Sequence, residues 1–193
     1  MNLFNKNNTM SESEIETIAK LASECFVTDE FYRTLEEDQE IRKEIIKNLF
    51  TESIRICNLY GKIYTYQVNS ECVGFALVVN WTKLKNDKKS FNYLFSSSNS
   101  NLDSKLIKES EFIENILGKD QDWIYLLAIC VSPSYRRKGI ATLLIRKIIE
   151  DYSYYNIFAD ISNQNSIELY RQLGFEILET IENCTFVKHL KEN

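Results

Sequence analysis

The segment "ICVSPSYRRKGIATLLIRKIIEDY", residues 129–152, carries the strongest structural signal in the chain. An apolar run ends at Pro133, the chain's only proline, and three cations follow it. Gly139 and Ala141 then open an apolar pattern that has the period of a helix. The segment therefore predicts a buried strand, a cationic turn and a helix packed on the sheet that contains the strand.

This turn has the features of an anion site. The first amides of a helix have no intrahelical partner, and the helix dipole places partial positive charge there, which suits a phosphate group. Gly139 allows close approach because it has no Cβ, and Ala141 keeps the first turn open. The cations Arg136, Arg137 and Lys138 add attraction for an anion. From these residues alone, a solvated charge run at an ordinary strand-to-helix turn is the alternative.

Length and composition bound the class of protein. The chain has 193 residues, of which 44% are apolar and 26% charged, so we expect one domain over residues 1–193. A net charge of −5 argues against a nucleic-acid partner. No stretch resembles a signal peptide or approaches the ~20 apolar residues of a membrane span. We therefore expect a cytoplasmic protein that makes no membrane contact.

The cysteine and histidine content argues against several chemistries. The chain has five scattered cysteines without a C-x-x-C pair, and its single histidine is His189. This pattern is typical of free, buried thiols in a reducing compartment. It predicts that there is no metal site and no Ser/His or Cys/His hydrolase.

The remaining patterns predict a mixed α/β fold. In chain order we expect helices at 11–26 and 38–59, a hairpin of strands at 62–68 and 72–81, a polar loop with one short helix at 82–101, a helix at 102–117, a strand at 123–131, a helix at 137–152, a strand at 156–162, a helix at 164–174, and strands at 175–181 and 184–190. Ser11 and Glu14 would form a capping box on the first helix. The core stripe of the second helix would be Ile41, Ile45, Leu49, Ile54 and Cys57. The unbroken apolar run at 123–131 is typical of a strand covered on both faces.

Two motifs resemble the GNAT N-acetyltransferase superfamily. The pattern [RQ]-x-x-G-x-[GA] after V-x-P is similar to Arg136 through Ala141, within 129–152. The segment "NQNSIELYRQLGFE", within 155–175, resembles N-x-x-A-x-x-L-Y-x-x-L-G-F, with Ser166 in place of Ala. The clear resemblance covers about residues 122–180. It implies a mixed, mostly antiparallel sheet with helices on both sides, in which "LLAICV" and "NIFADIS" are central strands that splay apart.

The resemblance also implies that acetyl-coenzyme A (acetyl-CoA) is the co-substrate, without a metal. In the family the pyrophosphate lies on the amides of the cationic turn, and the pantetheine arm pairs with the preceding strand like an added strand. Carried over residue by residue, the binding residues are Ile129, Val131, Arg136, Arg137, Lys138, Gly139, Ile140, Ala141, Thr142 and Asn163. From sequence alone, Asn163 is equally interpreted as a helix N-cap.

Tyr170 matches the tyrosine that the family uses as general acid. A phenol with a pKa of about 10 is protonated at neutral pH and can give its proton to a leaving thiolate. Without the motif, Tyr170 would be read as a half-buried packing residue. Cys130 neighbours the expected thioester position, but with no base beside it we favour a packing role over an acyl-enzyme.

The general base stays unassigned at this stage. Some family members place Glu at the position of Tyr125, which is not a carboxylate here. Asp122, Asp29 and Glu30 lie in segments near the expected site, but each is more readily a surface carboxylate.

The preferred function is transfer of an acetyl group to a primary amine by direct attack in a ternary complex. We expect a small-molecule acceptor before a peptide N-terminus or a lysine, and a monomer or homodimer. Two alternatives stay open: a non-catalytic acyl-CoA-binding regulatory or interaction module on the same fold, and an unrelated α/β protein that binds another anion at the turn.

Overall fold

The structure is a computed structural model, and it describes residues 2–6, 9–95, 113, 115, 122–181 and 184–191. Its elements are β1 (Asn2–Lys6), α1 (Glu12–Phe26), α2 (Glu30–Arg33), α3 (Gln39–Tyr60), β2 (Gly61–Val68), β3 (Glu71–Asn80), α4 (Trp81–Asn86), α5 (Lys88–Phe95), β4 (Trp123–Val131), a 3₁₀ turn (Pro133–Tyr135), α7 (Ile140–Asp151), β5 (Asn156–Ile161), a second 3₁₀ turn (Gln164–Ser166), α8 (Ile167–Gln172), β6 (Glu176–Ile181) and β7 (Cys184–His189). The helix expected at 102–117 lies outside the described residues, apart from Ile113 and Asn115.

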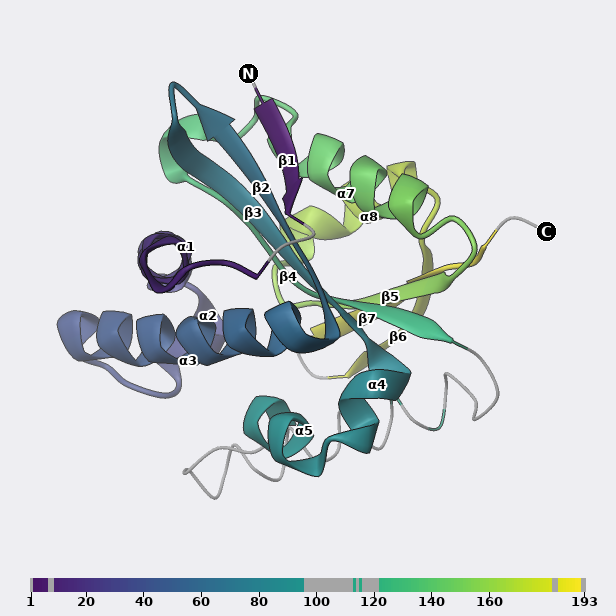
Figure 1. Cartoon of the computed structure of the whole chain (residues 1–193), viewed down its shortest axis with the longest axis horizontal. Coiled ribbons are helices and arrows are strands. Elements are labelled where there is room, and N and C mark those ends of the chain that lie inside the picture. Colours follow the sequence, from purple (N-terminus) through teal and green to yellow (C-terminus); the bar gives the residue numbers. More distant parts are fainter. Residues whose placement is uncertain are drawn as a thin grey trace.

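One sheet organises these elements. Its seven described strands run in the order β1-β2-β3-β4-β5-β7-β6. Only β4 and β5 pair in parallel, and every other neighbouring pair is antiparallel. Helices α1 and α3 lie on one side of the sheet, and α7 and α8 lie on the other (Figure 1). The predicted fold class, a mixed and mostly antiparallel sheet flanked by helices, is confirmed.

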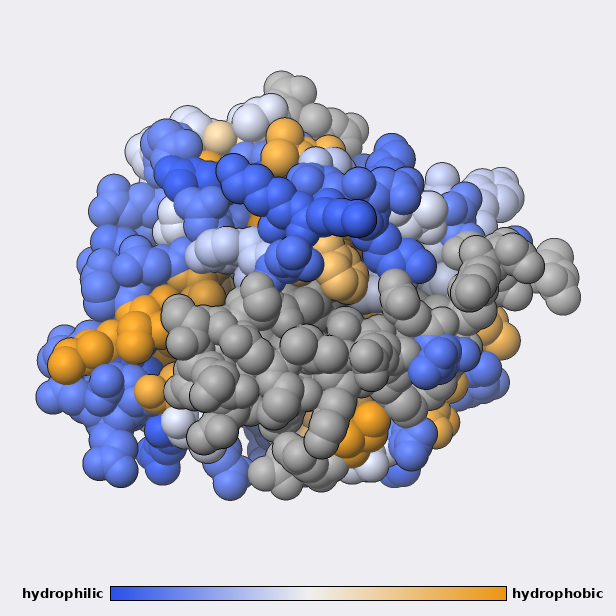
Figure 2. Space-filling model, turned by 90° about the horizontal axis from the view of Figure 1, so that it is seen from below, coloured by the Kyte–Doolittle hydropathy of each residue, from blue (hydrophilic) through white to orange (hydrophobic). Residues whose placement is uncertain are grey.

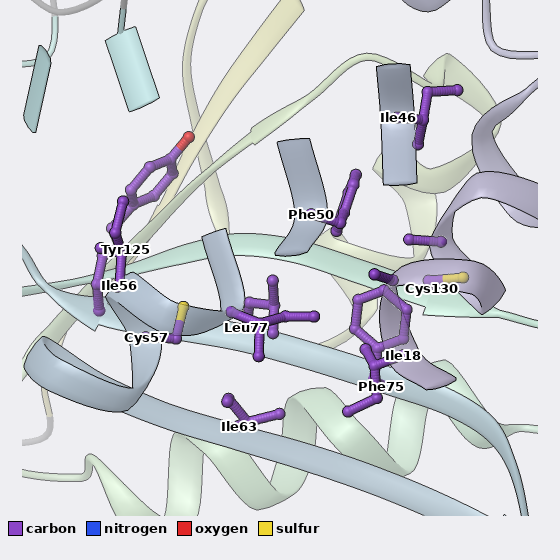
Figure 3. Close-up of a cluster of buried hydrophobic side chains, with 14 of the residues drawn as sticks. Ile18, Ile46, Phe50, Ile56, Cys57, Ile63, Phe75, Leu77, Tyr125 and Cys130 are labelled. Carbon is purple, nitrogen blue, oxygen red and sulfur yellow. The ribbon is translucent and has the colours of Figure 1, made fainter. Parts of the chain in front are cut away.

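Side chains of the central strands alternate between two apolar layers. Trp123, Tyr125 and Phe158 belong to the layer that contains α1 and α3, whereas Ile124 and Leu126 belong to the layer that contains α7. All five are at most 4% exposed. Figure 3 shows part of the first layer, with Tyr125 at its edge. The apolar run at 123–131 forms a strand, as predicted, but only its first half is covered on both faces; residues 127–129 are partly exposed.

Most predicted elements are present, with four corrections. Residues 82–101 were expected to hold one short helix, but the described part holds α4 and α5, and Trp81 begins α4 instead of ending the strand. The edge strand β1 was not predicted. Helix α7 begins at Ile140 and not at residue 137, because Gly139 precedes it in the left-handed conformation. The segment 164–174 contains a 3₁₀ turn before the short helix α8.

The start of α1 was predicted correctly, but the stripe of α3 was partly wrong. Ser11 and Glu14 form the capping box. In α3, Ile46 and Phe50 are buried, while Ile41 is 54% exposed. Figure 2 shows that the face seen from below carries apolar surface among hydrophilic residues. The buried row begins at Arg42, so its first position is occupied by a charged residue that the apolar pattern does not register.

Gly61 explains how α3 can lead directly into β2. A Cβ at this position would lie 1.8 Å from the carbonyl oxygen of Val78 on β3. At the other end of the hairpin, Asn69 and Ser70 have φ values of 50° and 67°, which a two-residue turn of the type I′ kind requires. The predicted hairpin is confirmed, with Gly61 added to its first strand.

Candidate active site

The two parallel strands separate halfway along the sheet. β4 and β5 pair from Trp123 with Asn156 to Leu126 with Ala159, and no pairing between them continues beyond that point in the described chain. β4 stays paired with β3 up to Val131. We call the gap that begins after this last pair the fork; its position agrees with the expected splay.

A bulge accompanies the separation. On β4, Leu126 pairs with Val78 and Ala128 pairs with Leu77, so Leu127 is an extra residue in the ladder. A bulge bends its strand and increases the local twist, which directs β4 away from β5. Burial changes at the same place: residues 123–126 are buried, whereas 127–129 are partly exposed. The fork thus leaves one edge of β4 accessible.

The turn after β4 presents free amides at the start of α7. The first bond of the helix runs from the amide of Leu143 to the carbonyl of Gly139, at 3.0 Å. The amides of Ile140, Ala141 and Thr142 precede it and have no intrahelical acceptor. Gly139 has φ 77°, and a Cβ added there would meet no atom within 4 Å. Open space at Gly139, next to three amides without an intrahelical acceptor, fits a diphosphate.

The three cations of the turn are placed differently from one another. Arg136 bends back toward the strand, where Nε donates to the carbonyl of Val131 at 3.2 Å and Nη2 to that of Cys25 at 3.5 Å. The Nζ of Lys138 lies 4.7 Å from the ring centroid of Tyr135. Arg137 is exposed and has φ 61°, an uncommon conformation for a residue with a side chain. Arg136 therefore ties the turn to β4 and α1, while Arg137 and Lys138 remain at the surface.

Tyr170 projects from α8 into the layer between the sheet and α7. It is 4% exposed, and its ring lies edge-on to Phe175, with 5.2 Å between centroids. Burial raises the pKa of the Tyr170 hydroxyl, and the negative charge of Asp160 on β5 raises it further. The phenol is therefore protonated at neutral pH, and it lies within electrostatic reach of a residue at the fork.

Comparison with known proteins places this architecture in a family. A family model described as "Acetyltransferase (GNAT) family" matches residues 15–175. The chain belongs to the GNAT acetyltransferase family. In sequence, this GNAT protein is similar to N-alpha-acetyltransferase 50 of Danio rerio, 35% identical over 73 residues that cover 34% of this chain and 43% of the relative. The chain spans less than half the length of the curated relatives that it matches.

Solved structures share the fold at low sequence identity. Arylalkylamine N-acetyltransferase 2 of Aedes aegypti has a TM-score of 0.71 at 16% identity, covering 100% of both chains. The PaiA N-acetyltransferase of Thermoplasma acidophilum, solved in complex with coenzyme A, has a TM-score of 0.57 at 15% identity, covering 98% of this chain and 99% of the other. At these identities the likeness shows that the GNAT protein has their fold.

Asp160 is the residue at the fork that the sequence did not identify. It is the first residue of β5 beyond the last β4–β5 pair. The Tyr125 hydroxyl donates a hydrogen bond to Asp160 Oδ1 at 2.5 Å, and the Cys184 thiol lies 3.9 Å from Oδ2. Burial raises the pKa of the Asp160 carboxyl, and the bond from Tyr125 partly offsets this. Tyr125 thus stands on β4 where some family members have a carboxylate, and it is hydrogen-bonded to a carboxylate on the neighbouring strand β5.

The link between α1 and α3 lies beside the open end of β5. Asp29 caps α2, since Oδ1 accepts from the amide of Phe31 at 3.0 Å, and Oδ2 accepts from the Ser162 hydroxyl at 3.4 Å. Tyr32 is half-buried, and burial together with the charges of Asp29 and Asp160 raises the pKa of its hydroxyl. Acidic and aromatic groups therefore gather on this side of the fork.

The other carboxylates considered from sequence lie elsewhere. Asp122 is exposed at the start of β4, the paired end of the two strands, and accepts from the Thr82 hydroxyl at 3.5 Å. Glu30 is exposed in the first turn of α2. Neither is brought to the fork as Asp160 is.

Three further residues have structural contacts. The side chain of Asn163 accepts from the amide of Asn165 at 3.0 Å, so it caps the 3₁₀ turn, as one of its two interpretations predicted. Burial raises the pKa of Cys130, which keeps its thiol neutral and favours a packing role. His189 packs its ring on Phe175, with 5.2 Å between centroids.

The described residues contain no group of three or more His, Cys, Asp or Glu side chains placed to hold a metal ion. In the same part of the chain, no helix has the length and apolar character needed to cross a membrane.

Proposed function

We propose that this GNAT protein transfers an acetyl group from acetyl-CoA to a primary amine in a ternary complex. The observation that carries this proposal is the fork, which opens one edge of β4 beside the unpaired amides of α7. Together they form a continuous backbone surface that suits a cofactor with a diphosphate at one end and amide groups along its arm. The family relatives support the same reaction, since their names describe acetyltransferases.

Residues of the turn and of β4 would hold the cofactor. The amides from Arg137 to Thr142 would bind the diphosphate, with Arg136 fixing the turn and Gly139 leaving space for it. Backbone groups near Ile129 and Val131 would pair with the pantetheine arm, and the exposed Asn163 would bond to it. When bound, acetyl-CoA supplies an acetyl group activated as a thioester.

Tyr170 would act as the general acid. Its hydroxyl, kept protonated by burial, would give a proton to the sulfur that leaves the acetyl group. A backbone N–H of the open β4 edge would stabilise the oxyanion that forms when the amine attacks. In this proposal Tyr170 supplies the proton for the leaving sulfur, and a backbone N–H of β4 carries the charge of the oxyanion.

We propose a small-molecule amine as the first acceptor class and a peptide N-terminus as the second. The small-molecule acceptor is supported by the structural neighbour named for arylalkylamines, whose fold extends over the whole of both chains. The peptide acceptor is supported by the sequence relative named for N-alpha-acetylation, over 34% of this chain. The half-buried Tyr32 and Asp29 beside the fork suit a cationic, partly apolar amine of either kind.

The test is release of coenzyme A thiol from acetyl-CoA with a panel of arylalkylamines, aliphatic amines and short peptides, with product mass measured for each. Calorimetry with coenzyme A is run in parallel. Binding together with an acetylated product supports the proposal. Binding without any product would instead support the non-catalytic acyl-CoA-binding module. No binding would reject both.

A further inference from the structure

We propose that the Asp160 carboxylate, oriented by the Tyr125 hydroxyl, is the catalytic base that takes a proton from the acceptor amine. This inference rests on the proposed acetyl transfer and names a residue for a role that the two family motifs leave empty. It follows from the position of Asp160, from its hydrogen bonds and from the groups that face it.

The position of Asp160 is set by the strand register. Ala159 forms the last pair with β4, so Asp160 is the first β5 residue at the fork. Ala159 faces the layer of α7, and Phe158 faces the layer of α1 and α3. Because side chains alternate along a strand, Asp160 points to the same side as Phe158, where the link between α1 and α3 carries Asp29 and Tyr32.

The hydrogen bonds fix the carboxylate. Phe158 stacks on Tyr125 with 4.6 Å between centroids and 1° between planes, which holds the phenol in place. Figure 3 shows the Tyr125 hydroxyl directed away from the aliphatic side chains of the layer. That hydroxyl donates to Asp160 Oδ1 at 2.5 Å, and Oδ2 is the oxygen nearer the Cys184 thiol. The phenol therefore positions a carboxylate that comes from the neighbouring strand.

The surroundings make Asp160 a stronger base than an exposed aspartate. Tyr125 of β4 and Cys184 of β7 hydrogen-bond to the carboxylate and lower its pKa. In turn, the charge of Asp160 raises the pKa of Tyr32 of α2 and of Tyr170 of α8, and Asp29 also raises that of Tyr32. Burial is the largest influence and raises the pKa of Asp160. A base whose pKa approaches the working pH is more effective in proton transfer.

The proton balance closes with two residues. The acceptor arrives as R–NH₃⁺, and Asp160 takes one proton from it and later returns that proton to solvent. The nitrogen lone pair then forms the new C–N bond. As the C–S bond breaks, Tyr170 gives its phenolic proton to the sulfur and regains one from the acylated nitrogen. The net products are the amide, the free thiol and one proton in solution.

The activity test uses Asp160→Asn, with Asp122→Asn as the control that removes an exposed carboxylate at the opposite end of β4. We expect kcat/KM for the amine to fall by about 10²- to 10⁴-fold at neutral pH in Asp160→Asn. The affinity for coenzyme A by calorimetry should stay within a factor of about two. The deficit should shrink as the pH rises toward the pKa of the amine, because a neutral amine needs no base. A loss that is the same at every pH, or no loss, would overturn the assignment.

Tyr125→Phe separates a chemical role from a structural one. Without the Tyr125 hydroxyl, the charged form of Asp160 loses a hydrogen bond, so its pKa rises. The acidic limb of the kcat/KM profile should therefore move to higher pH, while the rate on the plateau is largely kept. A fall in rate with no movement of the limb would show that the hydrogen bond serves only the fold.

A third measurement needs no turnover. The pKa of Asp160 is higher in the folded than in the unfolded protein. The contribution of this group to the free energy of unfolding is therefore fully present below the ordinary aspartate pKa, and it is lost as the pH rises through the pKa of the folded state. Urea unfolding at a series of pH values should show Asp160→Asn gaining stability relative to wild type across that window. A difference that does not change with pH would overturn the inference. An inactive wild type would instead reject the proposed function and leave this measurement standing.

Discussion

Tyr170 combines two properties that usually conflict, because it is a core residue and a proposed proton donor. Its ring contributes to the apolar layer between the sheet and α7, and its hydroxyl lies within reach of the charge of Asp160. Burial makes a phenolate costly, so the hydroxyl keeps its proton until a stronger base forms beside it. A departing thiolate is a base of that kind.

Tyr170→Phe should keep the fold and lose turnover. Removing only the hydroxyl leaves the contact with Phe175, so the midpoint of thermal unfolding should change by only a few degrees. We expect kcat to fall by about 10²- to 10³-fold, with coenzyme A affinity unchanged by calorimetry. Turnover equal to that of wild type would remove Tyr170 from the mechanism.

Asp160 shows why some site residues cannot be found in the sequence. It stands between apolar residues in "NIFADIS", and its partner Tyr125 lies 35 positions earlier. No local spacing links them, because the pairing depends on the parallel register of β4 and β5. The turn at Gly139 and the helix of Tyr170 were predicted correctly as elements because their residues follow one another along the chain. The stripe of α3 was predicted incorrectly at Arg42, because a charged residue is taken as exposed in an apolar pattern, whereas Arg42 is buried.

The fork is a property of two strands and one bulge. β4 is held by β3 along its length but by β5 only up to Leu126. The strand therefore has hydrogen-bonding groups on one edge that the sheet does not use, and the partly exposed residues 127–129 mark them. A ligand that pairs with this edge would complete the sheet locally.

Hydrogen exchange should detect that pairing. On addition of coenzyme A, we expect amides within residues 127–131 to gain protection by at least tenfold, while those of 123–126 are already protected by β5 and change little. Mass spectrometry of overlapping peptides from β4 can distinguish the two halves. Equal protection of both halves, or none, would contradict binding along the fork.

The start of α7 gives a second prediction at this scale. Gly139→Ala places a side chain at φ 77°, which costs about 1 to 2 kcal/mol, but the Cβ meets no protein atom. The new methyl group would occupy the open space at Gly139, next to the helix amides that we propose hold the diphosphate. Coenzyme A affinity should therefore fall by at least tenfold.

Gly174→Ala is the matched control for that variant. Gly174 has φ 85° and lies away from the turn, next to His189. It should lose a similar amount of unfolding free energy and keep the affinity for coenzyme A. If both variants lose affinity equally, general destabilisation explains the effect and the amide cradle is wrong.

At the scale of the whole molecule, the segment beside the fork is held in place by a residue of α3. Arg42 of α3 is 6% exposed, and its Nε donates to the carbonyl of Val27 at 2.7 Å. Its Nη1 donates to the carbonyls of Glu36 and Glu37. One guanidinium thus ties both ends of the segment 27–38 to the helix layer, and this segment carries the residues beside β5. Arg42, the buried charged residue that interrupts the apolar pattern of α3, therefore positions the segment 27–38.

Arg42→Ala should therefore weaken acceptor binding more than cofactor binding. Three carbonyls lose a charged donor, so the free energy of unfolding should fall by about 2 to 4 kcal/mol. With the link loosened, KM for the amine should rise by about tenfold or more, while coenzyme A affinity by calorimetry is kept, because the turn at Gly139 lies on the other side of the fork.

Arg55→Ala on the same helix is the control: Arg55 is exposed and pairs with Glu12 and Glu52, so its loss should change neither quantity appreciably. An equal loss of amine and cofactor binding in Arg42→Ala would mean that the molecule responds as one unit and that the link has no separate role.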